Sequence, residues 1–432
     1  MVGADAILSG FTEVATLSRG PIPRRGVAME DLARIEKGAI ALSGETIAWV
    51  GKTSQLRRAV RLRKGGSRWE FPGGVAVPGL VDAHTHLVFA GDRSGEVRRK
   101  LRGESYLDIA RRGGGLLGTV RATRAASEKT LFKEALARLK RMVRWGTTAI
   151  EAKSGYGLRL DTELRMLQVV RKLSGATRAT IVPTFLGGHA VPPEFAGRPG
   201  TYVQDVVDRQ IPAVARQGIA RFCDVFCEPG FFSPEQSRRI LRAGMAAGLG
   251  AKIHAEEFVH SGGAQVAADL HAVSADHLLA ATADDRERLA ASGVIAVLLP
   301  TTPFASLAGT RSPGREFVDT GVSVALGSDL SPNSWEEAMP LVMAHAVYSG
   351  RLTPSEALTA ATVNSAHAIG LTGGGRIVPG GRADVACFDL PSVEHLGYRL
   401  SPPMPSAVFL GGVPEVRDLS MPELPLSRER VR

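Results

Sequence analysis

Residues 74–86, which read GVAVPGLVDAHTH, set an apolar run directly before Asp82, His84 and His86. The run has the length and composition of a buried strand. Side chains at positions i and i+2 of a strand lie on one face, so His84 and His86 point the same way where this strand ends. Two imidazoles that converge there suit a metal that accepts nitrogen ligands.

Short apolar runs like this one recur along the chain. Short apolar strands alternate with amphipathic helices, and eight of the strands precede a helix, near residues 80, 150, 184, 225, 253, 275, 297 and 325. Apolar strands separated by helices indicate a parallel sheet covered on both faces, and eight of them predict closure into a (β/α)8 barrel. We interpret the run RRGGGLLGTV, residues 111–120, as an interstrand loop.

The two ends of the chain have a different pattern. Residues 1–75 read as short alternating strands with turn residues between them, and residues 373–432 return to short β segments. We therefore predict an α/β protein with two domains. A small β-sandwich, built from 1–75 plus 373–432, flanks a (β/α)8 TIM-like barrel at 76–372.

Composition limits the class of protein. The chain has 432 residues and 44% hydrophobic content, which is ample for a large core. No apolar run reaches the ~18 residues of a membrane span, and the N-terminus has no basic region typical of a signal peptide. We expect no membrane partner. The three cysteines are too few for a disulfide framework, so we expect buried reduced thiols and a cytoplasmic protein.

The formal net charge of +10 raises the question of a nucleic-acid partner. Apart from RRAVRLRKGG at 57–66, however, the basic residues are dispersed, and few aromatic residues are present to stack on bases. We therefore expect a generally basic surface and no nucleic-acid partner. Such a surface would help to attract an anionic small molecule.

Further histidines and an aspartate lie at other strand ends. AKIHAEE places His254 at the fifth strand, AVSADHL places His277 at the sixth, and VSVALGSDL places Asp329 at the eighth. Taken singly, each histidine reads as an ordinary hydrogen-bonded side chain near a core. Because barrel active sites lie at the carboxyl ends of the strands, their corresponding positions predict a shared metal site.

This pattern resembles the metal-dependent amidohydrolase superfamily, whose barrel is also flanked by a sandwich made from both chain ends. No lysine ends the fourth strand, where dinuclear members carry a bridging carboxylated lysine; CDVFCEPG offers cysteines and Glu228, and Lys153 follows the second strand. The resemblance therefore implies one divalent metal per chain. Zinc fits three imidazoles and a carboxylate, and iron is also compatible. The implied ligands are His84, His86, His254 and Asp329.

Longer stretches resemble the imidazolonepropionase family over nearly the whole barrel. They are HTHLVFAGDR (84–93), GGGLLGTVRATRAAS (113–127), EAKSGYGL (151–158), VPTFLGGHAVPPEFAG (182–197), KIHAEEF (252–258) and SADHL (274–278). The resemblance implies metal-dependent hydrolysis of the lactam C–N bond of 4-imidazolone-5-propanoate to N-formimino-L-glutamate, a step of histidine degradation. It also implies a homodimer.

Amide hydrolysis needs a nucleophile, stabilisation of an oxyanion and a proton for the leaving nitrogen. Glu257 follows His254 by three residues, so it can face the pocket without binding the metal; we assign it proton transfer, against the reading of a surface carboxylate. We expect His277 to orient the water or stabilise the developing charge. Asp329 can bind the metal and receive the proton of the water.

The propanoate tail of the substrate requires cationic or hydrogen-bonding partners. The fork of Arg93 suits a carboxylate. By resemblance, Arg93, Tyr156 and His189 hold the substrate, helped by Tyr106. Without the resemblance, Arg93 would be interpreted as a solvated arginine, Tyr156 as an aromatic residue in a turn and His189 as a histidine at a strand end.

The stretch after Asp329 departs from the family. Where the family commonly has Asn-Pro-Gly-Thr, this chain has Ser331 in place of the asparagine and Asn333 in place of the glycine. We expect Ser331, Asn333 and Ser334 to donate hydrogen bonds to the ring or its carboxylate.

Two other functions remain open on the sequence. One is a related amidohydrolase that deaminates a purine- or pyrimidine-like ring, which would share the His-x-His pair, the later histidines and the aspartate. Such a ring is neutral and does not need the carboxylate-binding residues. The other is a binding or assembly module without activity, although such relatives usually lose metal ligands and every expected ligand is present here.

Overall fold

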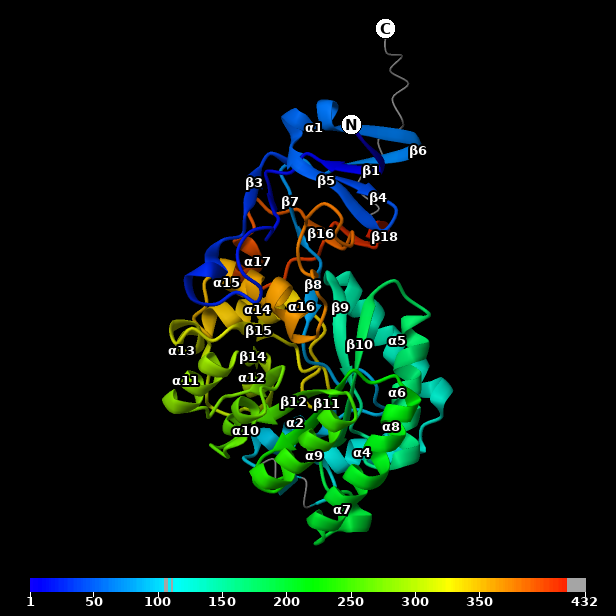
Figure 1. Ribbon diagram of the computed structural model, residues 1–432, viewed down its shortest axis with the longest axis vertical. Coiled ribbons are helices and arrows are strands. Elements are labelled where there is room, and N and C mark those ends of the chain that lie inside the picture. The colour runs from blue at the N-terminus through cyan, green and yellow to red at the C-terminus, as the bar shows by residue number, and fades with distance from the viewer. Residues whose placement is uncertain (105–107, 110–111, 418–432) are drawn as a thin grey trace.

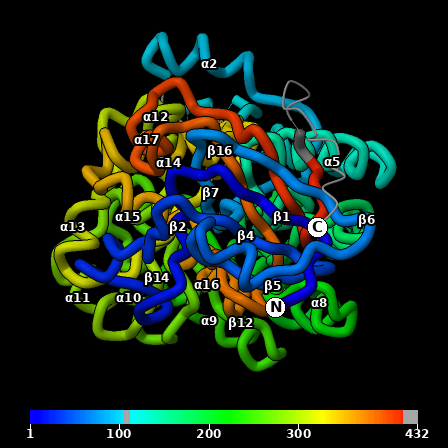
Figure 2. Tube along the Cα trace, turned by 90° about the horizontal axis from the view of Figure 1, so that it is seen from above, coloured from blue at the N-terminus to red at the C-terminus, as the bar shows by residue number. Residues whose placement is uncertain are grey.

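The computed structural model describes residues 1–104, 108–109 and 112–417. Two sheets from the chain ends lie at one end of a larger barrel (Figure 1). Seen from above, β1 (Val2–Ser9) and the strands from β4 (Gly38–Ser43) to β7 (Val75–Pro78) overlie that end of the barrel (Figure 2). None of the helices in the described part of the chain has both the length and the apolar composition to span a bilayer.

The barrel is one sheet of eight strands in the order β15-β14-β13-β12-β11-β10-β9-β8, with every neighbouring pair parallel. A parallel bridge between Thr85 and Leu330 joins its first and last segments. The predicted (β/α)8 barrel is therefore confirmed, strand by strand. The strands are β8 (Leu80–Asp82), β9 (Thr147–Lys153), β10 (Thr180–Gly188), β11 (Phe222–Cys227), β12 (Gly250–Ala255), β13 (Ser274–His277), β14 (Ile295–Leu298) and β15 (Val324–Leu326).

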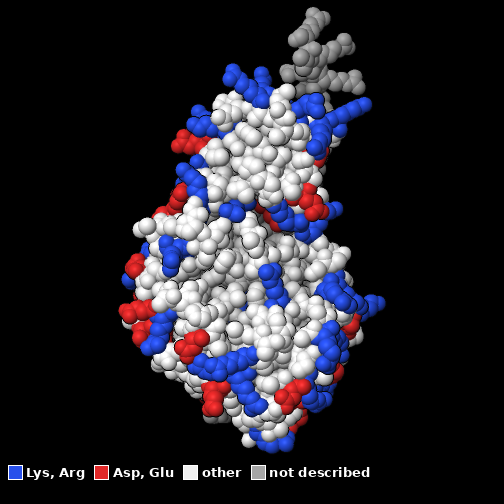
Figure 3. All heavy atoms as spheres, in the orientation of Figure 1, with Lys and Arg blue, Asp and Glu red and all other residues white. Residues whose placement is uncertain are grey.

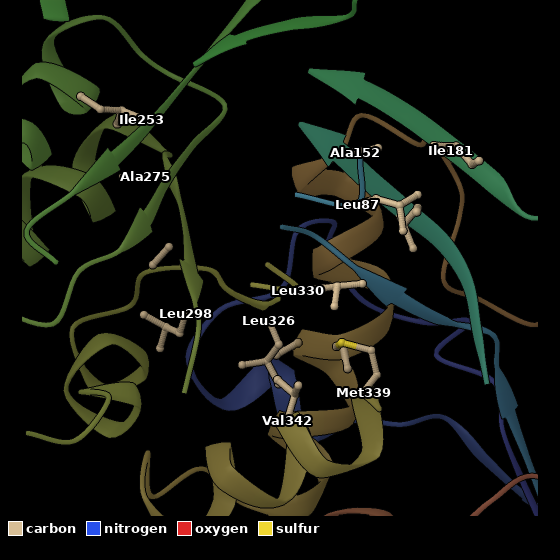
Figure 4. Packing of buried hydrophobic residues seen from close by; sticks show 14 of the residues in the cluster. Leu87, Ala152, Ile181, Ile253, Ala275, Leu298, Leu326, Leu330, Met339 and Val342 are labelled. Atoms are coloured by element: carbon tan, nitrogen blue, oxygen red, sulfur yellow. The ribbon is translucent and has the colours of Figure 1, made fainter. Parts of the chain in front are cut away.

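Helices cover the outside of the barrel, and their apolar faces pack on outward-facing strand residues. Figure 4 shows Leu326 of β15 beside Met339 and Val342 of α14. The helices are α2 (Ser94–Leu101), α4 (Gly115–Ala125), α5 (Glu128–Arg144), α6 (Leu160–Ser174), α7 (Pro199–Asp205), α8 (Ile211–Gln217), α9 (Pro234–Ala246), α10 (Gly263–Asp269), α11 (Ala283–Ser292), α12 (Thr301–Ser306), α13 (Gly314–Asp319), α14 (Met339–Tyr348), α15 (Pro354–Thr359) and α16 (Ser365–Ala368).

The interpretation of residues 111–120 as a loop is wrong from Gly115 onward. The chain turns through positive φ at Gly113 and Gly115 and then continues as α4. This helix buries Leu116 and Val120, four residues apart on one face. The helix begins at the last of the three glycines. The spacing of the apolar residues that follow them indicates a helix, and the interpretation as a loop overlooked that signal.

The terminal segments form two sheets around their own core. One has the order β5-β4-β1-β6 and the other β18-β17-β16-β7-β2-β3. Apolar side chains such as Leu8, Ile40, Val385 and Phe409 fill the space between them, as in the predicted sandwich. The strands are β1 (Val2–Ser9), β2 (Glu13–Ala15), β3 (Arg34–Glu36), β4 (Gly38–Ser43), β5 (Thr46–Lys52), β6 (Val60–Glu70), β7 (Val75–Pro78), β16 (Val385–Phe388), β17 (Ala407–Leu410) and β18 (Val413–Arg417).

The inside of the barrel changes character along its axis. Near the sandwich it is apolar, with side chains such as Ala149, Phe222 and Val297. Further along the same strands the inward positions are charged; on β9, Ala149 is followed two and four residues later by Glu151 and Lys153, both fully buried. Because β8 leads away from the sandwich, the carboxyl ends of all eight strands lie at the opposite end, where α2, α4 and α7 are seen (Figure 1).

The distribution of surface charge and the state of the cysteines agree with what composition predicts. On the face in Figure 3, Lys and Arg are spread over both parts of the molecule, with Asp and Glu between them. Cys223, Cys227 and Cys387 are buried free thiols, as expected.

Candidate metal and substrate site

The four side chains expected to bind a metal meet at the carboxyl ends of the barrel strands. His84 and His86 share a face just beyond β8, with their Nε2 atoms 3.3 Å apart. Asp329, beyond β15, has Oδ1 at 3.5 Å from His86 Nε2 and 3.8 Å from His84 Nε2. His254, on β12, has its ring centre 4.5 Å from that of His84. Ligand atoms of two sets, His84 with His86 and Asp329, and His84 with His254 and His277, lie within 4.8 Å of one another.

Buried carboxylates fix the orientation of two of these imidazoles. His84 Nδ1 lies 2.6 Å from Asp276 Oδ2, and His254 Nδ1 lies 3.1 Å from Asp224 Oδ1. When Nδ1–H of a neutral imidazole donates a hydrogen bond to an ionised carboxylate, the Nε2 atom carries the lone pair. His254 Nε2 is buried and has no hydrogen-bond partner among the described residues. A ligand atom of His254 lies within 4.8 Å of ligand atoms of His84 and His277.

The electrostatics of the cluster keep its imidazoles neutral. Burial lowers the pKa of His84, His86 and His254 well below the ordinary value, and nearby cationic groups add to the effect. A neutral imidazole has the lone pair that a metal requires. Burial also raises the pKa of the Asp329 carboxyl to about 7. Three neutral imidazoles and one carboxylate fit a divalent ion of the zinc type.

The backbone at the site adopts conformations that L-residues rarely take. His277 has φ 75° and Asp329 has φ 54°, both in the left-handed region. Such conformations cost about 1–3 kcal/mol each and persist only where the surroundings enforce them. Asp329 is held from two sides, because its backbone N–H donates to His84 O at 3.0 Å and its Oδ2 accepts from Thr302 Oγ1 at 3.0 Å. No motif or spacing in the sequence indicated Thr302.

Glu257 lies in a loop that two other carboxylates hold in place. Glu228 accepts hydrogen bonds from the backbone N–H groups of Glu257, Phe258 and Val259, at 2.9–3.3 Å. Glu256 accepts those of residues 261, 262 and 264. Glu257 Oε2 thereby comes within 3.6 Å of His277 Nε2. Burial, with the nearby charges of Asp329 and Glu228, raises the pKa of Glu257 well above its ordinary value.

A similar carboxylate shapes the loop that carries Tyr156. Glu163, fully buried on α6, accepts hydrogen bonds from the backbone N–H groups of Gly155, Gly157 and Leu158 at 2.7–3.0 Å. Gly155 O in turn lies 3.0 Å from His189 Nδ1. Tyr156 and His189 therefore depend on one helix residue that the motif itself does not contain.

A small cavity opens beside His86, His254 and Asp329, and most of the predicted substrate-binding residues line it. Arg93, at the start of α2, lies 2.8 Å from Glu96 and also reaches this cavity. Ser334 is buried and hydrogen-bonded to Ser331, and it is not part of the lining. Tyr106 lies outside the described residues. The lining is His86, Arg93, Leu116, Tyr156, His189, Phe226, His254, Glu257, Phe258, His277, Asp329, Ser331 and Asn333.

The sequence matches the amidohydrolase family over residues 75–414. It is 44% identical over 379 residues to an imidazolonepropionase of Shouchella clausii, covering 87% of this chain and 85% of that one. It is also 44% identical over 415 residues to an imidazolonepropionase of Haloarcula marismortui, covering 95% and 96% of the two chains.

Among solved structures, the fold is similar to that of a zinc-bound adenosine deaminase from Xanthomonas campestris. The TM-score is 0.70, over 98% of this chain and 95% of that one. At 17% sequence identity the likeness concerns the fold.

Proposed function

Because this chain belongs to the amidohydrolase family and, within it, to the imidazolonepropionases, we propose that it opens the lactam ring of 4-imidazolone-5-propanoate with water, giving N-formimino-L-glutamate. It is a hydrolase that acts on a cyclic amide C–N bond. The observation that carries this function is 44% identity to an imidazolonepropionase over 95% of the chain. The deaminase alternative is not favoured, since the similarity to a deaminase concerns the fold alone.

We propose that the site holds one divalent metal ion, with His84, His86, His254 and Asp329 as ligands. The support is that ligand atoms of His84, His86 and Asp329 lie within 4.8 Å of one another, that a ligand atom of His254 lies equally close to one of His84, and that His254 Nε2 has no hydrogen-bond partner among the described residues. Zinc fits the donor set, and iron is compatible with it. Such an ion, when bound, lowers the pKa of water and polarises a carbonyl group.

Glu257 is the proton carrier of the proposed reaction. It takes a proton from the attacking water as the oxygen bonds to the lactam carbon, and it delivers a proton to the ring nitrogen as the C–N bond breaks. Its raised pKa suits a group that must hold and release a proton. His277, 3.6 Å from Glu257, orients the water or stabilises the charge that develops on the carbonyl oxygen. Asp329 assists as a second acceptor of the water proton.

The wall of the cavity holds the substrate. Arg93 pairs with the propanoate carboxylate, and Tyr156 and His189 form the adjoining wall. Ser331 and Asn333 donate hydrogen bonds to the ring or its tail. We keep Ser334 in this set through its bond to Ser331, and Tyr106 through the resemblance alone.

The setting of the enzyme completes the proposal. We propose a cytoplasmic homodimer that acts on an anionic small molecule. Three buried free thiols agree with a reducing compartment, and the dimer follows from the resemblance. The boundaries 1–75 plus 373–432 for the sandwich and 76–372 for the barrel stay a prediction.

The direct test is hydrolysis of freshly prepared 4-imidazolone-5-propanoate by the zinc-loaded protein, followed as loss of the ultraviolet absorbance of the substrate. We expect turnover that stops on chelation and returns with zinc. No turnover with this substrate, together with ammonia release from a nucleobase, would overturn the proposed function in favour of deamination.

A further inference from the structure

Directly beneath the proposed metal ligands lies a cluster of five charged side chains, all completely buried. It consists of Glu151 and Lys153 on β9, Asp224 on β11, Lys252 on β12 and Asp276 on β13. Three carboxylates and two ammonium groups leave one formal negative charge. Buried ion pairs are weak contributors to stability, because well-packed apolar residues often serve as well. A cluster of this size beside a metal site therefore points to a role in the site.

Lys153 is the centre of the cluster. Its Nζ lies 2.7 Å from Asp224 Oδ2, 2.9 Å from Glu151 Oε2 and 3.3 Å from Asp276 Oδ2. Burial alone would lower the pKa of this ammonium, but the three carboxylates raise it above the ordinary value. Burial raises the pKa of Asp224, and Lys153 opposes that rise.

Each aspartate that Lys153 contacts also contacts one of the proposed metal ligands. Asp276 Oδ2 lies 2.6 Å from His84 Nδ1, and Asp224 Oδ2 lies 3.1 Å from His254 Nδ1. One ammonium group thus joins two carboxylate–imidazole arms that come from four different strand segments. Contacts of this kind behind a metal ligand set its tautomer and direction.

We propose that Lys153 is a positioning residue for the metal site, because it holds Asp224 and Asp276 where they aim the Nε2 atoms of His254 and His84 at one ion. The inference deepens the proposed metal site and rests on it. Without the lysine, each of the two aspartates would be free to turn away from its imidazole. The lysine removes that freedom for both arms at once.

Lys252 provides a matched control in the same cluster. It is equally buried, and its Nζ lies 2.9 Å from the same Glu151 Oε2. Its other contacts are the carbonyl oxygens of Ala83 at 3.4 Å and Ala368 at 3.5 Å, and the ring of Phe222, whose centre lies 5.4 Å from Nζ. It shares the burial and the charge of Lys153, and its charge also acts on Asp224 and Asp276, but it forms its ion pair with Glu151 and not with either aspartate.

The test measures zinc affinity of the metal-free full-length chain by competition with a chromophoric chelator. We expect Lys153→Met to raise the Kd for Zn²⁺ by about 10–100-fold, the usual cost of losing support behind a metal ligand. We expect Lys252→Met to bind Zn²⁺ within about threefold of the wild type. Equal affinity of Lys153→Met and wild type, or equal losses in the two lysine variants, would overturn the inference.

A second readout follows the imidazoles directly. Nitrogen-15 NMR of metal-free protein labelled at histidine should show the Nδ1–H tautomer for His84 and His254 in the wild type and in Lys252→Met. In Lys153→Met we expect that signature to weaken. An unchanged tautomer population in Lys153→Met would contradict the positioning role, because a merely structural lysine would alter thermal stability alone.

A charge-balanced double variant, compared with Asp276→Asn alone, keeps the test usable if Lys153→Met does not fold. Asp276→Asn removes one arm, and Lys153→Met/Asp276→Asn removes one charge of each sign. We expect the double variant to bind Zn²⁺ at least threefold more weakly than Asp276→Asn, because the Asp224 arm is lost as well; equal affinities would overturn the inference. A wild-type chain that binds no Zn²⁺ would instead overturn the proposed metal site, and neither result depends on the substrate.

Discussion

The floor and the wall of the site are built in opposite ways. The floor, here Glu151, Lys153, Asp224 and Asp276, lies on barrel strands and is fully buried. The wall, here Arg93, Tyr156, His189, Glu257 and Asn333, lies mainly in segments that follow strands and lines the cavity. Strands give the floor its rigidity without further help, whereas the wall needs Glu163 and Glu228 to tie its loops by their N–H groups. We infer that the floor orients the metal and the wall selects and converts the substrate.

The sharpest way to break this division is to remove chemistry from the wall without touching the floor. We expect Glu257→Gln to lower kcat by about 10²–10⁴-fold, because the amide cannot carry the proton. Zinc affinity should stay within about threefold of the wild type, since Glu257 is not among the proposed ligands. Steady-state kinetics and chelator competition measure the two quantities. Unchanged turnover would show that another group carries the proton.

The next largest effect should separate binding from chemistry within the wall. Arg93→Ala removes a charge-assisted pair with the substrate tail, worth about 1.5–3 kcal/mol, so KM should rise about 10–100-fold with kcat nearly constant. The pair Arg93–Glu96 complicates the variant, and Glu96→Gln is the control for loss of that pair. A fall in kcat alone would reassign Arg93 to the reaction.

The contrast also explains which parts could be predicted from the sequence. The barrel strands were visible as apolar runs between helices, and His84, His86, His254 and Asp329 were visible because they end such runs. The floor was missed, although Ala149, Glu151 and Lys153 alternate at the spacing of one strand face. A charge at an inward position of an otherwise apolar strand was the available signal.

The carboxylates behind the wall gave no such signal. Glu163 lies on an ordinary amphipathic helix, and nothing in its local pattern distinguishes it from a surface residue. Its role depends on the backbone N–H groups of Gly155, Gly157 and Leu158, which tertiary structure brings to it. Contacts of that kind form only in the folded chain, and they produce no regular spacing of residues in the sequence.

A steric change at Gly327 tests the ligand His84, whose Nδ1 lies 2.6 Å from Asp276 of the floor. A Cβ at Gly327 would lie 2.7 Å from His84 Cβ and 2.8 Å from Leu299 Cδ2. Gly327→Ala should therefore cost about 1–3 kcal/mol of folding free energy and displace His84, weakening zinc binding several-fold. Urea unfolding and chelator competition measure the two effects.

Gly95→Ala is the matched control, because a Cβ there meets open space on α2. We expect it to leave the free energy of unfolding unchanged or slightly raised. Equal behaviour of the two alanine variants would mean that the backbone around His84 shifts without cost and that His84 is held less firmly than its contact with Asp276 suggests.

The smallest predicted effect tests whether the wall depends on its tied loops. In Glu163→Gln, one carboxylate oxygen becomes an NH2 group that faces either the N–H of Gly155 or those of Gly157 and Leu158. A buried donor without an acceptor costs about 1–3 kcal/mol, and the loop with Tyr156 should relax. We expect KM to rise about 3–10-fold. Zinc affinity should be unchanged, because the hydrogen bonds of Glu163 go to the loop and not to the floor residues. A loss of zinc affinity equal to the rise in KM would show that floor and wall act as one unit, and the division drawn between them would then be wrong.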